Sequence, residues 1–143
     1  MKDQIVVDVK TVGINEVREH PANVRRGDVE LLMDSLAVHG QYRPIVVQRG
    51  TGYILAGNHT WKAARRLGWK EIGVTYVDVD GETAAKIMVA DNRTSDLASY
   101  DDSVLLELLI GLDDLSATGF DELDIDRLSG LFDDDEEGSD WLS

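Results

Sequence analysis

A sharp turn between a strand and a helix constrains this chain more than any other feature of its sequence. In residues 54–69, ILAGNHTWKAARRLGW, an apolar run ends at Gly57, and a helix-like run over residues 61–67 ends at Gly68. The first N–H groups of a helix have no partner within it and carry partial positive charge. A glycine just before them lets a ligand approach the backbone closely. The stretch therefore predicts a site for an anion such as a phosphate group.

Side chains at this turn can add to the backbone contacts. Asn58, His59 and Thr60 can hydrogen-bond to an anion, and Lys62 adds a positive charge. His59 can also act as a general acid or base, because the pKa of histidine lies near neutrality. The alternative interpretation is a plain helix without a ligand, capped by Asn58 or Thr60.

Apolar and β-branched patterns on both sides of the turn predict a small mixed α/β (α+β) domain. A tight turn at residues 49–52 predicts that the strands beside it pair as a hairpin. Asp28 is expected to cap one helix and Gly40 to end it. Polar residues from Asn92 onward are expected to end the helix predicted at residues 84–92. The expected strands are residues 5–9, 44–48, 53–56 and 71–79, and the expected helices are residues 29–39, 61–67, 84–92, 103–112 and 123–132.

The net charge of −14 is unevenly distributed along the chain. Residues 1–100 carry equal numbers of acidic and basic side chains, and residues 18–70 have an excess of five basic ones. Residues 101–143 carry fifteen acidic side chains and a single basic one, Arg127. The pattern indicates a mildly basic body with an acidic appendage. Residues 133–143 have too little apolar content to pack, so we expect them to be disordered.

Several classes of protein are excluded by composition. The chain has no cysteine, which rules out disulfides, thiolate metal sites and cysteine nucleophiles. No run approaches the roughly 18 apolar residues of a membrane-spanning helix, and the first residues do not form a signal peptide. We therefore expect a soluble cytoplasmic protein of a bacterium or a phage-infected cell, with no membrane partner.

Four blocks carry a resemblance to a known family. They are HPANVR at residues 20–25, GQYRPIVV at 40–47, AGNHTWKAARRLG at 56–68 and ADNRTSDL at 90–97. In order and spacing they resemble the boxes of the N-terminal domain of the ParB family, within the ParB/sulfiredoxin superfamily. Pro21 and Arg25 match the first box, and Asn92 matches the fourth. The resemblance covers about residues 5–100 and implies a small mixed sheet with helices, followed here by a helical extension over 101–132.

The resemblance implies a nucleotide site that contains Mg²⁺, with CTP as the ligand in chromosome-segregation members of the family. In it Arg25 and the segment with Gly40, Gln41 and Arg43 reach toward the phosphates. Gly57, Asn58, His59, Thr60 and Lys62 would cradle the triphosphate, and Asn92 would help hold the metal. Oxygen ligands combined with substrate phosphates suit Mg²⁺.

The third block departs from the family pattern, because Asn58-His59-Thr60 replaces its Glu-Arg-Arg. The nucleotide therefore stays open between CTP and ATP or ADP. Sulfiredoxin chemistry needs a cysteine at the position of Asn58 and is excluded. The short, acidic-tailed architecture looks like the stand-alone ParB-like proteins of bacteriophages and mobile elements, and a homodimer fits the family.

Three functions remain open from the sequence. The first is a Mg²⁺-dependent nucleotidase, phosphotransferase or nuclease in which His59 and Asp91 are catalytic. The second is a non-catalytic adaptor that binds DNA or a DNA-associated protein through residues 18–70, with the acidic tail competing for that surface. The third is mimicry of DNA by the tail, which would capture a basic protein.

Overall fold

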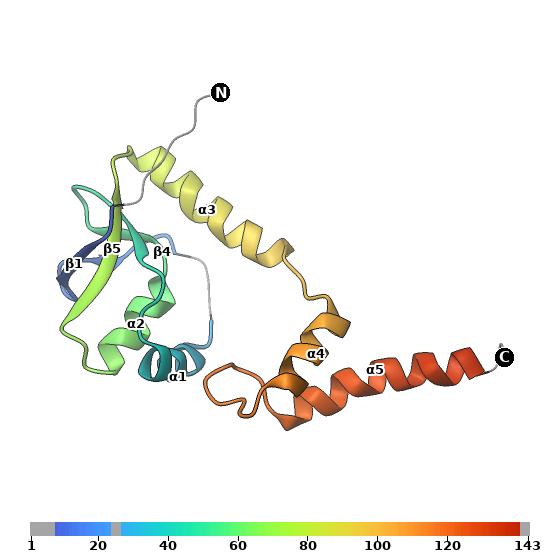
Figure 1. Cartoon of the computed structure of the whole chain (residues 1–143). Coiled ribbons are helices and arrows are strands. Elements are labelled where there is room, and N and C mark those ends of the chain that lie inside the picture. Colours follow the sequence, from blue (N-terminus) through green and yellow to red (C-terminus); the bar gives the residue numbers. More distant parts are fainter. Residues whose placement is uncertain (1–7, 24–26, 141–143) are drawn as a thin grey trace. The chain divides into compact units, whose positions relative to one another are not determined.

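The computed structural model describes residues 8–23 and 27–140, with only the backbone described for residues 133–140. It divides into two compact units, Met1–Leu97 and Ala98–Ser143, which we describe separately. Figure 1 shows the sheet with α1, α2 and α3 in the first unit, and α4 and α5 in the second. Among the described residues, no helix has the length and apolar character needed to cross a membrane.

The first unit is built on a mixed sheet of five described strands in the order β1-β5-β3-β4-β2. Strand β5 pairs antiparallel with β1 and parallel with β3, while β4 pairs antiparallel with β3 and parallel with β2. The predicted hairpin of β3 and β4 is confirmed. The strands are β1 (Lys10–Gly13), β2 (Arg18–Glu19), β3 (Ile45–Gln48), β4 (Tyr53–Ala56) and β5 (Glu71–Val77).

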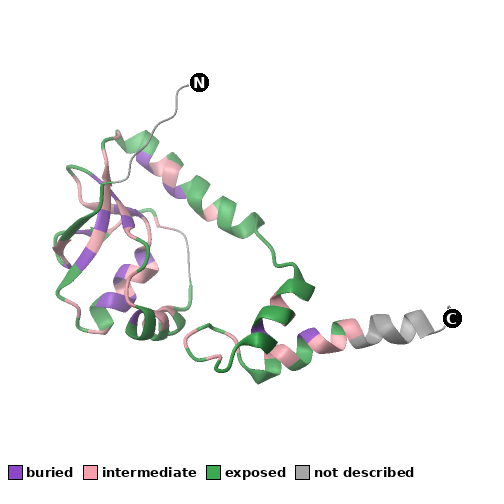
Figure 2. Ribbon diagram, viewed as in Figure 1, coloured by how far each residue is buried: buried purple, intermediate pink, exposed green. Residues whose placement is uncertain are grey.

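Alternate residues of the central strands form the core together with two helices, α1 (Val29–His39) and α2 (Asn58–Arg66). Buried residues, purple in Figure 2, gather on the strands and on α2. The indole N–H of Trp61 donates to the carbonyl of Ile14 at 2.8 Å and ties α2 to the segment after β1. The core residues of strands and helices are Ile45, Val47, Ile54, Ile72, Val74, Leu36, Trp61, Ala63 and Ala64.

The first helix has the limits that its sequence predicts. The carboxylate of Asp28 accepts a hydrogen bond from the N–H of Leu31 at 3.1 Å, and α1 ends at Gly40, whose φ is 73°. The predicted cap and the predicted terminal glycine are both confirmed.

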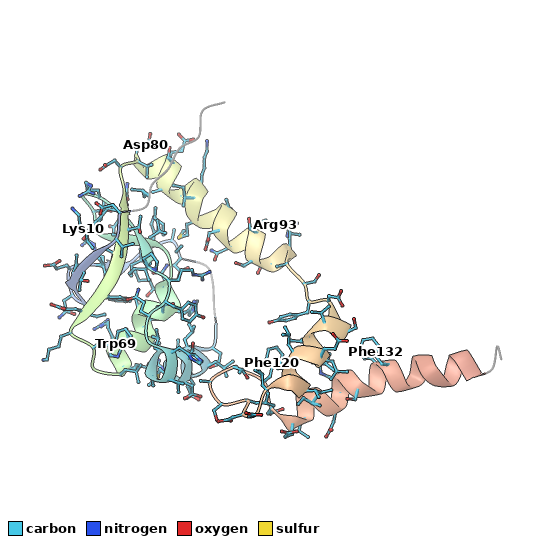
Figure 3. The ribbon with its side chains drawn as sticks, viewed as in Figure 1. Lys10, Trp69, Asp80, Arg93, Phe120 and Phe132 are labelled. Atoms are coloured by element: carbon cyan, nitrogen blue, oxygen red, sulfur yellow. The ribbon has the colours of Figure 1, made fainter. Side chains whose placement is uncertain are left out.

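The third helix, α3 (Gly81–Leu97), is longer than predicted. Asp80, labelled at its start in Figure 3, accepts the N–H of Thr83 at 2.7 Å, and this bond lowers the pKa of the Asp80 carboxyl. The predicted break after Asn92 is wrong, because polar residues without glycine or proline continue a helix at little cost on an exposed face. Helix α3 packs along β4 and extends far enough to bring Asp91 beside other segments.

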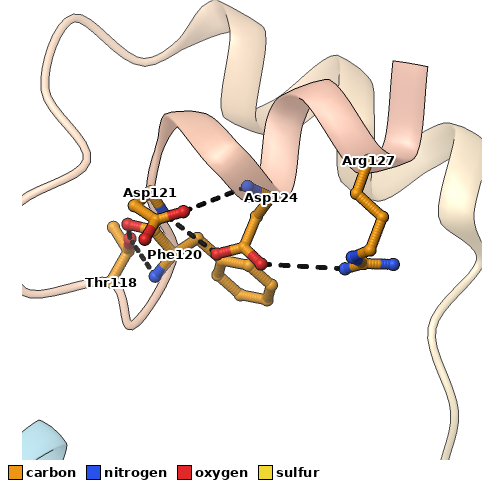
Figure 4. A network of polar contacts seen from close by, with 5 residues as sticks. All are labelled: Thr118, Phe120, Asp121, Asp124 and Arg127. Carbon is orange, nitrogen blue, oxygen red and sulfur yellow. Dashed lines mark hydrogen bonds and ion pairs between the residues drawn. The ribbon is translucent and has the colours of Figure 1, made fainter. Parts of the chain in front are cut away.

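The second unit contains α4 (Asp102–Gly111) and α5 (Glu122–Asp140), which pack on each other and bury Leu109 and Leu128. Figure 4 shows the start of α5, where Asp121 and Asp124 each accept the other's backbone N–H. The backbone is helical as far as Asp140, although the sequence predicts disorder from residue 133. Glutamate favours helix, and no proline interrupts this run. Residues 141–143 lie outside the described residues.

One predicted strand differs from the structure, and one observed strand was not predicted. The predicted strand at 5–9 falls partly outside the described residues, and its described end precedes β1, which begins at Lys10. Strand β2 has only two residues, Arg18 and Glu19, so it is too short to produce a recognisable alternation. Its parallel pairing with β4 nevertheless places the following loop, which begins at His20, beside that strand.

Candidate functional site

A pocket of about 380 Å³ lies at the N-terminus of α2, and we call it the α2 pocket. It is formed entirely within the first unit, by α1, the loop after it, β3, the β4–α2 turn, β5 and α3. Its volume is within the range of small-molecule sites. The lining residues are Leu32, Ser35, Leu36, Gly40, Gln41, Tyr42, Arg43, Pro44, Ile45, Val46, Ala56, Gly57, Thr60, Thr75 and Asp91.

The turn into α2 requires a glycine. Gly57 has φ 99° and ψ 22°, in the left-handed region, and a Cβ built on it would lie 2.9 Å from the Cβ of Ile45. Helix α2 opens directly from this residue, because the N–H of Trp61 donates to the carbonyl of Gly57 at 3.0 Å. The close approach of the turn to β3 leaves no room for a larger residue.

The N-terminus of α2 lacks a side-chain cap. No side chain of the described segments accepts a hydrogen bond as the cap of this helix, whose N-cap is Gly57. The predicted cap by Asn58 or Thr60 is therefore wrong, because the N-cap residue is Gly57. The N–H groups of the first turn have no acceptor one turn earlier in the helix, and they give this wall of the pocket a partial positive charge.

The loop between α1 and β3 is held in place by Gln41. Its side-chain amide donates to the carbonyl of Gly73 at 2.9 Å and accepts the N–H of Gly73 at 2.7 Å. Strand β3 pairs with β5 only from Ile45, which lies opposite Val74, so the Gln41 amide continues the ladder by one position. From the sequence, Gln41 is expected to contact phosphate. In the structure, its side-chain amide bonds to Gly73 and positions the loop that carries Arg43.

Removing this amide is expected to destabilise the fold. The Gln41→Ala variant leaves the N–H and carbonyl of Gly73 without these partners, and we expect a loss of about 1–3 kcal/mol in the free energy of unfolding. Urea denaturation measures the loss. Asn15→Ala, an exposed amide in the turn after β1, is the control and should change stability by less than about 0.5 kcal/mol. Equal effects of the two substitutions would contradict the anchoring role.

The polar groups of the pocket come from separate elements. Among the polar residues that line it, Arg43 comes from the loop, Thr60 from α2 and Asp91 from α3. Arg43 and Asp91 are exposed, whereas Thr60 is half-buried. The described residues contain no cluster of three or more histidine, cysteine or acidic side chains that could hold a metal alone. A metal here would need oxygen ligands besides these side chains, such as water or phosphate oxygens.

Other predicted site residues lie outside this pocket. Asn58 is only 6% exposed, and its Nδ2 donates to the carbonyl of Ile54 at 3.2 Å while its buried Oδ1 has no hydrogen-bond partner in the described structure. The ring of His59 lies against Gly27, at 3.4 Å from a Cβ built there. Asn92 does not line the pocket, and Arg25 lies outside the described residues.

Lys62 lies on a different side of α2 from the pocket. It lies two positions after Thr60, which places the two side chains roughly 160° apart around the helix axis. Its Nζ is 3.0 Å from the Oε1 of Glu19. Together with Arg65 and Arg66 it lines a shallow depression of about 290 Å³ on this basic face.

Sequence reasoning missed part of the lining. Ser35 and Thr75 come from α1 and β5, which were predicted only as packing elements. Tyr42 stands between the predicted residues Gln41 and Arg43, so an aromatic inside the second block was an available signal. The remaining contacts join segments distant in sequence and leave no local pattern.

Residues 2–93 match the sequence profile of the ParB N-terminal domain. The chain belongs to the ParB N-terminal domain family. The family predicted from the four blocks is confirmed, and the match covers nearly all of the first unit, including the α2 pocket.

Curated relatives of this ParB-like chain include chromosome-associated proteins. It is 25% identical over 117 residues to the nucleoid occlusion protein of Oceanobacillus iheyensis, covering 78% of this chain and 41% of the relative. It is 28% identical over 117 residues to a probable chromosome 2-partitioning protein ParB of Deinococcus radiodurans, covering 74% of this chain and 40% of the relative. The ParB-like chain thus spans about two fifths of the length of these relatives.

Solved structures support the same fold. The C-terminally truncated partitioning protein ParB of Caulobacter crescentus, complexed with CTP-γ-S, superposes with a TM-score of 0.60 at 22% identity. The match covers 73% of this chain and 64% of that one. A Pnob8-like ParB-N domain superposes with a TM-score of 0.51 at 20% identity, covering 59% of this chain and 37% of that one. The predicted mixed α/β fold is confirmed.

Proposed function

We propose that this ParB-like domain binds a nucleoside triphosphate with Mg²⁺, and that the α2 pocket holds its phosphates. The observation that carries the proposal is the uncapped N-terminus of α2, which opens from Gly57 into a pocket of about 380 Å³. Backbone N–H groups at a helix N-terminus bind phosphate through hydrogen bonds and the helix dipole. The Caulobacter relative of similar fold carries a CTP analogue, which makes CTP the first ligand to test.

Two side chains of the pocket suit this ligand. The Arg43 guanidinium can bind phosphate oxygens through paired N–H groups, and it projects from a loop anchored by Gln41. The Thr60 hydroxyl lies in the first turn of α2 and can donate to the same anion.

The pocket also fits Mg²⁺ that arrives with a nucleotide. Proteins often hold Mg²⁺ with one or two carboxylates, and substrate phosphates and water supply the remaining ligands. Asp91 is the acidic side chain lining the described pocket and would be that carboxylate. The metal would neutralise phosphate charge, and Asp91 would orient the attacking water in any hydrolysis of the nucleotide. Asn92 and His59, which do not line the pocket, would act only indirectly.

Calorimetric titration tests the proposal with CTP, ATP, ADP and GTP, each with Mg²⁺. We expect saturable binding that the Arg43→Ala variant weakens by about tenfold or more, because charge-assisted hydrogen bonds to phosphate are lost. Arg49→Ala removes the same charge from an exposed position outside the pocket and should retain affinity. Absence of binding by all four nucleotides would refute the proposal.

The metal assignment gives a separate prediction. Asp91→Asn should reduce the gain in nucleotide affinity on adding Mg²⁺ by about tenfold, whereas His59→Ala should alter affinity by less than about twofold. Parallel titrations with Mg²⁺ and with EDTA measure the gain. Asp34→Asn, an exposed carboxylate on α1, is the matched control. A larger effect of His59→Ala than of Asp91→Asn would contradict the assignment of the metal to Asp91.

Nucleic-acid binding is a second candidate function. Lys62, Arg65 and Arg66 line one depression on the outer face of α2, and Arg65 also stacks on the Trp61 ring at 4.6 Å. Such a cluster would bind the phosphate backbone without reading its sequence. The test is duplex DNA affinity as a function of salt. Replacing Arg66 by alanine should lower the slope of log K against log salt by about one, and an unchanged slope would remove this face from the function.

A further inference from the structure

Residues 41–44 line two depressions, and Tyr42 is the aromatic residue among them. Tyr42 is 80% exposed and lines the α2 pocket. It also lines a second, open depression of about 530 Å³ along the start of β5. That depression is lined by Val9, Thr11, Gln41, Tyr42, Arg43, Pro44, Glu71, Ile72 and Gly73.

The loop that carries this aromatic ring is anchored to β5. The Gln41 amide bonds to both backbone groups of Gly73, and its Nε2 also donates to the carbonyl of Arg43 at 3.2 Å. Pro44, with its restricted φ, follows directly. With four fifths of its surface in solvent, Tyr42 contributes little to the core. An aromatic residue on an anchored loop beside a pocket provides contact area for a ligand without the cost of ordering the backbone that carries it.

The pocket offers two kinds of surface to a nucleotide. Gly57 and Thr60 mark the cationic end at the N-terminus of α2, whereas Tyr42 stands on the loop at the rim. The base of a nucleotide has two π-faces and few charges, and protein aromatics commonly stack on it. We propose that Tyr42 is the stacking surface for the base of the nucleotide whose phosphates occupy the α2 pocket. This inference rests on the proposed function and adds the part of the ligand that the phosphate site does not recognise.

If Tyr42 stacks on the base, the affinity for a nucleotide should depend on the size of its base. Stacking is tolerant of base identity, because every base has a π-face, and it strengthens with the size of the ring system. We therefore expect ATP and GTP to bind this chain at least as tightly as CTP.

The test separates the base from the phosphates by using inorganic tripolyphosphate, which has no base. Wild type, Tyr42→Ala and Tyr42→Phe are titrated with ATP, with CTP and with tripolyphosphate, all with Mg²⁺. Tyr42→Ala should weaken both nucleotides by about tenfold and change tripolyphosphate affinity by less than about twofold. Tyr42→Phe keeps the ring and should retain wild-type affinity. Val38→Ala, an exposed apolar residue on α1, is the truncation control.

The outcomes distinguish this inference from the phosphate site. If Tyr42→Ala lowered the affinity for tripolyphosphate as much as that for the nucleotides, stacking on the base would be overturned. The ring would then affect the phosphate-binding part of the pocket. Unchanged nucleotide affinity in Tyr42→Ala would overturn it while leaving the phosphate site intact. A marked preference for CTP over both purine nucleotides would also contradict it. If neither tripolyphosphate nor any nucleotide binds wild type, the proposed function fails and this inference with it.

Discussion

The Gly57→Ala variant is expected to lose about 2–5 kcal/mol of folding free energy, the largest stability effect of any single substitution considered for this chain. Two costs add. A left-handed backbone costs an L-residue roughly 1–2 kcal/mol, and the new methyl group would be forced against Ile45, 2.9 Å from its Cβ, where overpacking costs about 1–3 kcal/mol more. Urea denaturation followed by circular dichroism measures the loss.

Gly50 provides a matched control for this prediction. Its φ is 94°, close to the 99° of Gly57, but a Cβ built there meets no atom of the described residues within 4 Å. Gly50→Ala should therefore show only the backbone cost, about 1–2 kcal/mol. A Gly57→Ala variant no less stable than Gly50→Ala would mean that the turn does not press against β3 as described.

The Thr60→Asp variant should separate ligand binding from folding. Thr60 is the third residue of α2 and lines the pocket. A carboxylate in the first turn of a helix is favourable by about 0.3–1 kcal/mol, so the fold should be as stable as wild type or slightly more so. The same carboxylate would repel a phosphate at that site. We expect nucleotide affinity to fall by about a hundredfold or more, since a charge-assisted contact is replaced by repulsion.

Two variants check this interpretation. Asn15→Asp adds the same charge in an exposed turn and should leave affinity unchanged within about twofold once salt screens distant charges. Thr60→Val removes only the hydroxyl and should cost less than about tenfold, because the backbone N–H groups remain. If the Thr60→Asp variant binds nucleotide as tightly as wild type does, the N-terminus of α2 is not the phosphate site. This holds whatever the stability of the variant.

Local patterns account for the parts of the fold that the sequence predicts well. Asp28 and Gly40 delimit α1 because a cap and a left-handed glycine act within one helical turn. The hairpin of β3 and β4 follows from a four-residue turn between apolar strands. The turn at Gly57 was predicted from the same kind of information, and it does open a helix into a pocket.

Contacts between distant segments account for what the sequence could not supply. The Gln41 amide is a plausible phosphate ligand until β5 is known to lie beside it, where Gly73 takes both of its groups. Lys62 is close to Thr60 in sequence but points to another side of the helix. Asp91 lies within the helix predicted at 84–92, but no local pattern shows that α3 brings it to the pocket that Thr60 also lines.

The backbone amide resonances of residues 58–60 provide the most direct test of the phosphate site. The measurement is a series of ¹H–¹⁵N NMR spectra during titration with tripolyphosphate and Mg²⁺, in wild type and in Thr60→Asp. We expect saturable downfield proton shifts at Asn58, His59 and Thr60 in wild type, because these N–H groups would donate to phosphate oxygens. The variant should lose these shifts. Unmoved resonances at these three amides, with shifts instead at Lys62, Arg65 and Arg66, would contradict a phosphate site in the α2 pocket.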